Sequence, residues 1–424
     1  MEKLTLKELA VPMIKAIDSF NYLLKNHHRR VGVACYHIGR QLNLDKEELL
    51  ELVIAATLHD IGALSIQERD MLVKEDVENP EPHCLMGYQM LSNFEAFRPI
   101  AKIIRHHHIR YEDALRMNTD EVDDGCFILH LADRVDVLIA PDEFILMQKA
   151  RVTEHIRQKV GTVFHPKVFE AFLKASKSDI FWIDINNMTI EQLFDKLDFT
   201  LDFDLTFDMI LDFAQTISKI IDFRSRFTVS HSYTVAQLAG LIGTFFRWDE
   251  VDCKKLKIAG YLHDVGKIGI DPGIIEKPGK LTDEEFQMIK LHPYFTDQIL
   301  HELNESEWFK DIVDWAGNHH ENIQGTGYPH ALSGDEVHEG TKILAFSDVI
   351  TALMEDRPYR KGMPIDEAFS LIKDNIASKI SMEIFEELQE HKTEIDQLVA
   401  QCKLGTAQEY KDALRVIAET SSAD

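Results

Sequence analysis

The sequence predicts an all-α protein that contains two tandem copies of one helical domain. Apolar residues recur at helical spacing in residues 10–24, 49–62, 206–222 and 368–376. Short β-like stretches such as IFWIDI at 180–185 stand alone, with no neighbouring strand pattern to pair with. A repeat within the chain gives the second observation, because similar segments follow one another in the same order in both halves.

The repeat becomes visible when His27 is aligned with His231. Residues 42–62 then fall on residues 246–266 without a gap, and a His-Asp pair follows the first histidine at the same spacing in both copies. Four later pairs of segments match in order: PHCLMGYQML with LHPYFTDQIL, IIRHHH with AGNHH, HLADRVDVL with AFSDVITAL, and VFHPKVFEAFL with SMEIFEEL. The polar stretch at 176–195 is the best candidate for the joint, so we predict domains at residues 1–190 and 191–424.

Composition limits the kinds of partner this chain can bind. It has 424 residues, 45% of them apolar, and a formal net charge of −26. A protein this acidic is not expected to coat a nucleic-acid polymer, although a small anion can bind where basic residues cluster. Five scattered cysteines, no signal-peptide core in MEKLTLKELA and no long apolar run predict a cytoplasmic protein without a membrane span.

The C-terminal copy contains an ordered set of histidines and aspartates. Imidazoles and carboxylates are the ligands that hold Mn, Fe, Zn, Co or Ni. Adjacent His263 and Asp264 cannot face the same way within an ideal helix, but at a helix end they can reach two ions, with Asp264 as the bridge. Two ions about 3.5–4 Å apart can activate water and orient a phosphate. The candidate ligands are His231, His263, Asp264, His292, His319, His320 and Asp348.

These residues lie within sequence motifs that resemble those of the HD-GYP family, a branch of the HD-domain phosphohydrolases. His231 is followed by HDVGKIGI at 263–270, by IIEKPGKLTDEEFQMIKLHP at 274–293, by HHENIQGTGYP at 319–329, and by DRPYR at 356–360. Thr282 and Glu285 have capping-box spacing and predict the start of the helix that leads to His292.

The resemblance implies tandem HD-type helical bundles, with the seven residues above as metal ligands and Asp264 as the bridge. It also implies two divalent ions, Fe or Mn first and Ni, Co or Zn as alternatives. The implied activity is hydrolysis of a cyclic dinucleotide, with cyclic di-GMP as the leading substrate and linear pGpG or GMP as product. Lys267 is expected to contact the scissile phosphate, and Tyr328, Arg357, Arg360 and Lys361 are further candidate substrate contacts.

Two positions depart from the family pattern. Gln324 stands where the family usually has Asp, just before the glycine of the GYP loop. Phe227 stands where some members carry a Glu that binds a third metal, and a phenyl ring cannot coordinate an ion. We therefore expect two metals and not three.

The N-terminal copy resembles a generic HD domain more than an HD-GYP domain. It keeps a candidate at each ligand position: His27, His59, Asp60, His83, His107, His108 and Asp133. Ala63 replaces the lysine, and no GYP loop follows the histidines. Three roles stay open: a second hydrolase, a metal- or nucleotide-binding regulator, or a structural or dimerising domain.

Competing functions remain for the whole chain. The substrate can instead be a mixed cyclic GMP–AMP, since nothing in the sequence discriminates the two purines. In a different class, the protein is a receptor that binds the nucleotide without cleaving it, or a scaffold that docks partners through the GYP surface. A second copy of the chain and a signalling protein are candidate partners.

Overall fold

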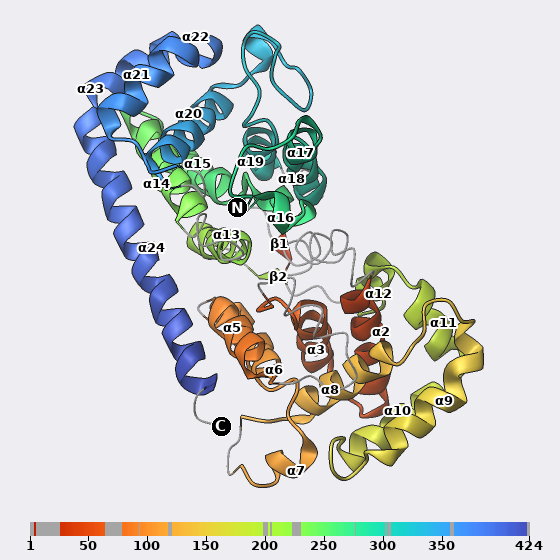
Figure 1. The fold of residues 1–424 in the computed structure, drawn as a ribbon. Helices are drawn as coiled ribbons and strands as arrows, with labels where there is room; N and C mark the ends of the chain where they lie inside the picture. The colour runs from red at the N-terminus through yellow and green to blue at the C-terminus, as the bar shows by residue number, and fades with distance from the viewer. Residues whose placement is uncertain are drawn as a thin grey trace. The chain divides into compact units, whose positions relative to one another are not determined.

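The computed structural model places most of the described chain in helices (Figure 1). Its description covers residues 4–5, 26–63, 79–92, 94–117, 121–197, 202–203, 206–222, 230–275, 277–301, 303, 307–356 and 360–421. The only strands in these ranges are β1, Leu4–Thr5, and β2, Asp202–Phe203, which pair with each other. The all-α prediction is therefore confirmed.

Two compact units divide the chain. The N-terminal unit comprises Thr5–Asp202 with Arg415–Asp424, and the C-terminal unit comprises Met1–Leu4 with Phe203–Leu414. The stretch at 176–195, predicted as the joint, is instead helical and contributes buried Phe181 and Trp182 to the N-terminal unit.

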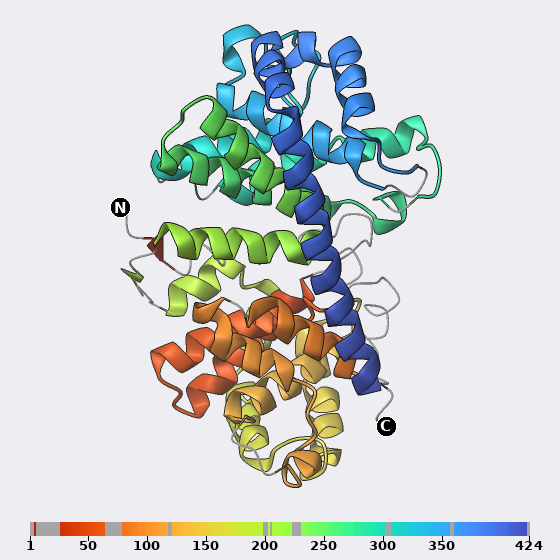
Figure 2. The ribbon, with the colours of Figure 1, turned by 90° about the vertical axis from the view of Figure 1, so that its left-hand side faces the viewer.

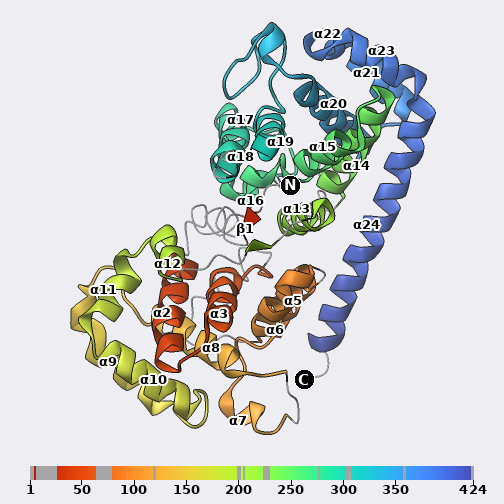
Figure 3. The same cartoon turned by 180° about the vertical axis from the view of Figure 1, so that it is seen from behind.

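The N-terminal unit is organised around α2. This helix packs against α3, α8, α10 and α11, and Figure 3 shows α9, α10 and α11 along its outer side. The helices of the unit are α2 (His27–Gln41), α3 (Lys46–Leu58), α5 (Glu81–Leu91), α6 (Arg98–Arg105), α7 (Tyr111–Ala114), α8 (Asp124–Val137), α9 (Ile145–Gln158), α10 (Pro166–Ser176), α11 (Asp179–Asn187) and α12 (Ile190–Leu197), with the 3-10 turn η1 (Glu95–Phe97).

The C-terminal unit is organised around the pair α14 and α15, which lie side by side in Figure 2. Helix α14 also packs on α20, and α15 packs on α13 and α19. The elements of the unit are α13 (Phe207–Asp222), α14 (His231–Phe245), α15 (Glu250–Leu262), η2 (Val265–Gly269), α16 (Pro272–Ile275), α17 (Asp283–Ile289), α18 (His292–Leu300), α19 (Glu307–Gly317), η4 (Gly334–Glu336), α20 (Glu339–Met354), α21 (Ile365–Asn375), α22 (Ala377–Ile380), α23 (Met382–Glu390) and α24 (Lys392–Ser421).

The predicted repeat is visible in the helices themselves. Helices α2 and α14 both have 15 residues, and α3 and α15 both have 13. An aspartate caps the second helix of each pair, Asp45 in α3 and Asp249 in α15, by accepting backbone N–H bonds in the first turn. Each of these helices then ends directly before its His-Asp doublet, so equivalent sequence signals build equivalent sites.

Local predictions had mixed outcomes. The Thr282–Glu285 capping box is present, with both reciprocal hydrogen bonds, at the start of α17, but α17 ends at Ile289 and His292 begins the next helix, α18. The β-like stretch at 180–185 lies within α11, where burial of Phe181, Trp182 and Ile185 outweighs β-propensity. All five cysteines are buried free thiols. Within the described ranges, no helix combines the length and apolarity that a membrane crossing requires. The cytoplasmic location stays a prediction.

A glycine after each His-Asp doublet lets the next ligand helix approach closely. A Cβ on Gly266 would collide with the carbonyl oxygen of His292 and lie 2.5 Å from the nitrogen of Thr296, both on α18. Gly62 has the same relation to His83 and Gly87 on α5. Thr296 locks the C-terminal contact, because its hydroxyl donates to the His263 carbonyl at 2.8 Å and accepts from the Gly266 N–H at 3.0 Å.

We predict that Gly266→Ala destabilises the C-terminal unit by about 1–3 kcal/mol, because the added methyl group pushes α18 away from η2. Thermal unfolding of the purified chain measures the change. Gly279→Ala is the matched control, since a Cβ there meets no atom within 4 Å. Equal melting temperatures for the two variants would show that the close approach is not required.

Candidate metal centre

The end of α15 positions the His-Asp doublet of the C-terminal unit. The helix ends at Leu262, His263 is its C-cap residue, and Asp264 leaves helical geometry with φ −98° and ψ 7°. Both side chains are buried. The change in backbone direction lets the two adjacent residues face one centre, as predicted for a helix end.

Asp264 divides the surrounding histidines between its two oxygens. Its Oδ2 atom lies 3.6 Å from His231 Nε2 and 3.2 Å from His263 Nε2. Its Oδ1 atom lies 3.3 Å from His292 Nε2. Each oxygen therefore serves a different group of imidazoles, which is the arrangement a bridging carboxylate needs.

The remaining candidates complete these two groups. Asp348, on α20, joins the first group, with Oδ1 3.2 Å from His231 Nε2. His319 joins the second, with its Nε2 atom 3.2 Å from that of His292. Ligand atoms of His231, His263 and Asp264 lie close enough to hold one ion, and those of His292, His319 and His320 close enough to hold another. All seven predicted residues thus converge.

Backbone carbonyls orient the imidazoles. The Nδ1 atoms of His263, His292 and His319 lie 2.7–2.8 Å from the carbonyl oxygens three residues earlier in the chain. A carbonyl only accepts, so in each ring Nδ1–H donates and Nε2 keeps its lone pair. The lone pairs consequently point to the centre, and outer hydrogen bonds of this kind support metal-binding histidines.

The charge states also suit cation binding. Burial lowers the pKa of His292 to about 3 and that of His320 to about 4, so both rings are neutral near pH 7. Burial opposes ionisation of Asp264, yet His263 and Lys267 hold its pKa well below the usual range. Neutral imidazoles and ionised carboxylates are the forms that coordinate divalent metals. The Nε2 atom of His263 is buried and has no hydrogen-bond partner in the described structure. These features fit a pair of transition-metal ions.

Two residues that the sequence analysis missed support the site. Glu355, at the end of α20, accepts hydrogen bonds from His231 Nδ1 at 2.9 Å and from the Ser230 hydroxyl at 2.8 Å. Glu321 is buried behind the GYP loop and accepts from the backbone N–H groups of residues 330–332 at 2.6–3.0 Å. Neither lies in the His-Asp pattern. The only sequence signal for Glu321 is its position directly after His319 and His320.

A cavity of about 900 Å³ opens onto the centre. Its wall includes His231, Asp264, His292, His320 and Asp348, together with the predicted substrate contacts Lys267, Tyr328 and Arg360. Apolar residues Ile270, Ile274, Ile275, Leu281, Phe286 and Ile289 line other parts. The cavity therefore combines ligands, cations and apolar surface, as expected for a ligand with phosphates and aromatic bases.

The predicted substrate contacts differ in their surroundings. The Lys267 ammonium pairs with Asp264 Oδ2, and the Tyr328 ring lies 4.8 Å from the His320 ring. Arg360 donates to the carbonyls of Leu353 and Ala352, at 2.9 and 2.6 Å, so its guanidinium also holds the end of α20.

Four other positions named from the sequence receive less support or lie outside the description. Lys361 is 90% exposed, pairs with Asp356 and is absent from the cavity wall, so its position does not support substrate contact. Arg357 and Phe227 lie outside the described residues. Gln324 is exposed on the loop, and its backbone N–H donates to Asn322 Oδ1 at 3.1 Å.

The N-terminal unit repeats the centre. Asp60 Oδ2 lies 3.8 Å from His27 Nε2 and 3.3 Å from His59 Nε2, and Oδ1 lies 3.8 Å from both His83 Nε2 and His107 Nε2. Three overlapping groups of ligand atoms form here: Asp60 with His83, His107 and His108; His27 with His59 and Asp133; and His28 with His59 and Asp60. The structure thus brings together all seven predicted residues.

The two centres differ in detail. His28 adds an imidazole on α2, with Nε2 3.7 Å from Asp60 Oδ2, where Ser232 stands in the other copy. Asp136 takes the place of Glu355, since its Oδ2 atom accepts from His27 Nδ1 at 2.6 Å. Arg134 forks onto Asp133 Oδ2 through Nε and Nη2, at 3.0 and 2.6 Å.

Comparisons with known proteins agree with this geometry. Models of the HD domain match residues 24–138 and residues 215–384. Two curated relatives from Vibrio cholerae serotype O1, 3′3′-cGAMP-specific phosphodiesterases 1 and 3, are 28% and 26% identical to this chain. Each alignment covers 91% of this chain, and 91% and 94% of the relatives.

Two further comparisons give a relative named for a different cyclic dinucleotide and a solved structure of similar fold. A cyclic di-GMP phosphodiesterase from Thermotoga maritima is 30% identical over 60% of this chain and 66% of its own length. A solved cyclic GMP-AMP-specific phosphodiesterase of Vibrio cholerae has a similar fold, with a TM-score of 0.61 at 22% identity, covering 92% of this chain and 98% of the other.

The helical bundles and their His-Asp centres define a protein with two HD domains. With its GYP loop beside the second centre, the chain belongs to the HD-GYP family and carries an additional HD domain before the HD-GYP domain.

We predict that Glu355→Gln weakens metal affinity of the C-terminal centre about 10- to 100-fold. The variant replaces the charged carboxylate that accepts a hydrogen bond from His231 Nδ1 by a neutral amide. Competition with a fluorescent chelator measures the affinity. Glu339→Gln, an exposed position at the other end of α20, is the control. An affinity equal to the control would contradict a role for Glu355 in orienting His231.

Proposed function

We propose that the C-terminal domain is a metal-dependent phosphodiesterase that hydrolyses a 3′3′-linked cyclic dinucleotide. One observation carries this proposal. A buried carboxylate, Asp264, stands between two groups of metal-ligand atoms at the wall of a cavity of about 900 Å³. Homologous proteins named as cyclic dinucleotide phosphodiesterases support the same reaction.

His231, His263, Asp264 and Asp348 would hold one divalent ion, and His292, His319 and His320 would hold a second that shares Asp264. Fe and Mn are the preferred candidates, because mixed imidazole and carboxylate sets accept both. Such a pair would lower the pKa of water at the site and neutralise negative charge on a phosphoryl group.

The chain's own groups would bind and orient the substrate. Lys267 lies on the cavity wall beside Asp264, where an ammonium can approach a phosphate oxygen bound at the centre. The Tyr328 ring contacts His320 and lies 4.7 Å, centroid to nitrogen, from the Lys290 ammonium, and it forms part of the cavity wall. The apolar wall would exclude water around the bases and strengthen these charge interactions.

Mixed cyclic GMP–AMP is the substrate that the comparisons favour. The two relatives that align with 91% of the chain, across both HD domains, are named for 3′3′-cGAMP. The cyclic di-GMP phosphodiesterase aligns with 60% of the chain. Cyclic di-GMP, the leading substrate from the sequence analysis, is retained as the second candidate.

The deciding experiment incubates full-length protein, loaded with Mn²⁺ or with Fe²⁺ under anaerobic conditions, with each of three cyclic dinucleotides. We expect linear dinucleotide or mononucleotide products from the mixed cyclic GMP–AMP, with a lower kcat/KM for cyclic di-GMP, and the least turnover of cyclic di-AMP. Binding of a nucleotide without any product would establish the receptor function instead, and neither binding nor turnover would favour the scaffold.

We predict that Lys267→Met lowers kcat by about 100-fold, because the variant loses a cation that stabilises charge developing on the phosphate. Steady-state kinetics on the preferred substrate measure the effect. Lys310→Met is the matched control, since Lys310 pairs with Glu307 on the surface of α19. Metal content should stay the same in both variants. A kcat within twofold of the control would remove Lys267 from the reaction.

A further inference from the structure

A second, smaller pocket lies in the N-terminal unit beside its His-Asp centre. Its volume is about 300 Å³, one third of the cavity in the C-terminal unit. Cavities of about 300 Å³ are at the lower end of the range for small-molecule sites. The pocket is therefore suited to a ligand of about one nucleotide and not to a cyclic dinucleotide.

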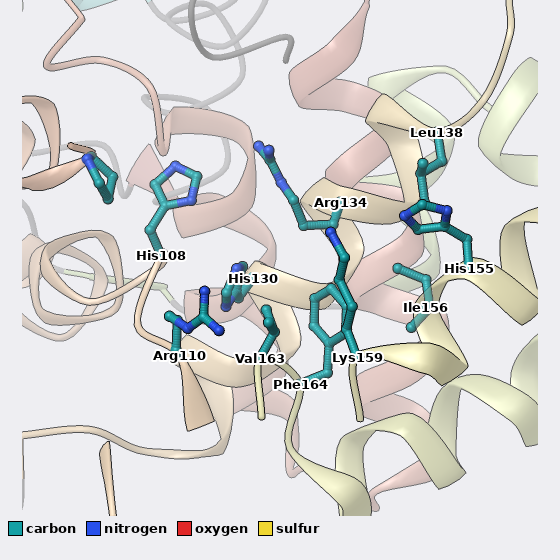
Figure 4. Close-up of a pocket in the computed structure, with 11 residues that line it drawn as sticks. His108, Arg110, His130, Arg134, Leu138, His155, Ile156, Lys159, Val163 and Phe164 are labelled. Carbon is teal, nitrogen blue, oxygen red and sulfur yellow. The ribbon is translucent and has the colours of Figure 1, made fainter. Parts of the chain in front are cut away.

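The wall of this pocket is basic. Arg110, Arg134 and Lys159 contribute three cationic side chains, and none of the 11 described lining residues is acidic (Figure 4). The whole chain carries a net charge of −26, so a wall of this kind is unusual for its composition. Arg110 pairs with Glu112 and Arg134 with Asp133, but a guanidinium has five N–H donors and can bind a second anion beside the first.

His108 connects the pocket to the candidate metal centre. It lines the pocket, and its ring also belongs to the ligand group of Asp60, His83 and His107. Its Nε2 atom is buried and has no hydrogen-bond partner in the described structure. An anion in the pocket would therefore be adjacent to any cation that His108 helps to hold.

Arg134 connects the pocket to the same centre from another side. Its guanidinium grips Asp133, the candidate ligand on α8, and its side chain lines the pocket. The C-terminal centre has Lys267 next to Asp264, whereas Ala63 stands at the matching position of the N-terminal copy. Arg134 thus places a cation beside the N-terminal centre, next to Asp133 and not next to Asp60. The C-terminal copy has no such arginine, because Val349 stands at the position that matches Arg134.

The remaining wall is apolar. It contains Leu138, Ile156, Val163 and Phe164, which Figure 4 shows in the same lining as the basic groups. Inorganic phosphate has no apolar surface for these side chains to cover. A phosphate joined to an organic body has both the charge for the basic wall and the apolar area for these residues.

We propose that the N-terminal HD domain is a separate, metal-assisted binding site for a small phosphomonoester, such as a mononucleotide. Its phosphate lies between the His-Asp centre and the cations Arg134 and Lys159, and its organic part lies against the partly exposed Leu138 and Val163. This site does not depend on the proposed activity of the C-terminal domain. It gives the first domain a ligand of its own, distinct in size from the cyclic dinucleotide.

The test measures binding of 5′-AMP to full-length protein loaded with Mn²⁺, by isothermal titration calorimetry. All proteins carry Asp264→Asn, so that the mononucleotide does not report on the C-terminal centre. We expect Lys159→Gln to weaken AMP binding about tenfold, the effect of losing one charge-assisted hydrogen bond. Lys174→Gln, an exposed position on α10 outside the pocket, is the matched control and should leave the Kd unchanged.

Two further measurements separate this proposal from nonspecific binding. Adenosine, which lacks the phosphate, should bind at least tenfold more weakly than AMP. Asp60→Asn should remove the dependence of AMP binding on Mn²⁺, because it changes the carboxylate between the two ligand groups. Equal AMP affinity in the Lys159→Gln and Lys174→Gln proteins, or no AMP binding with Mn²⁺ present, would overturn the proposal.

Discussion

A buried, ionised carboxylate between two sets of imidazoles is the constraint on which the C-terminal domain depends. Removing a carboxylate from water costs several kcal/mol unless cations or hydrogen bonds compensate for the lost hydration. Asp264 faces His231 and His263 with one oxygen and His292 with the other. Within the chain, the Lys267 ammonium pairs with Asp264 Oδ2 and supplies part of this compensation. Metal ions at this position would add positive charge beside both oxygens.

The helical fold provides the geometry that this centre requires. Helix α15 ends one residue before the doublet, so adjacent side chains can turn toward the same point. Gly266 lets α18 come close enough to deliver His292, and carbonyls three residues earlier orient three of the rings. The same devices recur at His59, Asp60 and Gly62. One structural solution has therefore been used twice, with different cations and different pocket volumes beside it.

Much of this arrangement could be predicted from the sequence, because equal spacing in two copies constrains where the ligands must lie. The set of candidate ligands and the helix end at His263 followed from that pattern. Glu355, Glu321 and Arg134 could not be found in this way, since their importance comes from contacts made through space with His231, the GYP loop and Asp133. At residues 180–185 the local pattern was misleading instead of silent. Its β-propensity carries no information about the aromatic core against which α11 packs.

Anomalous diffraction from crystals of the full-length protein grown with Mn²⁺ examines the centre most directly. We expect two anomalous peaks in the C-terminal unit about 3.5–4 Å apart, with one oxygen of Asp264 on each ion. A single peak, or an Asp264 carboxylate turned away from the ions, would contradict a bridged pair and with it the basis for the proposed hydrolysis.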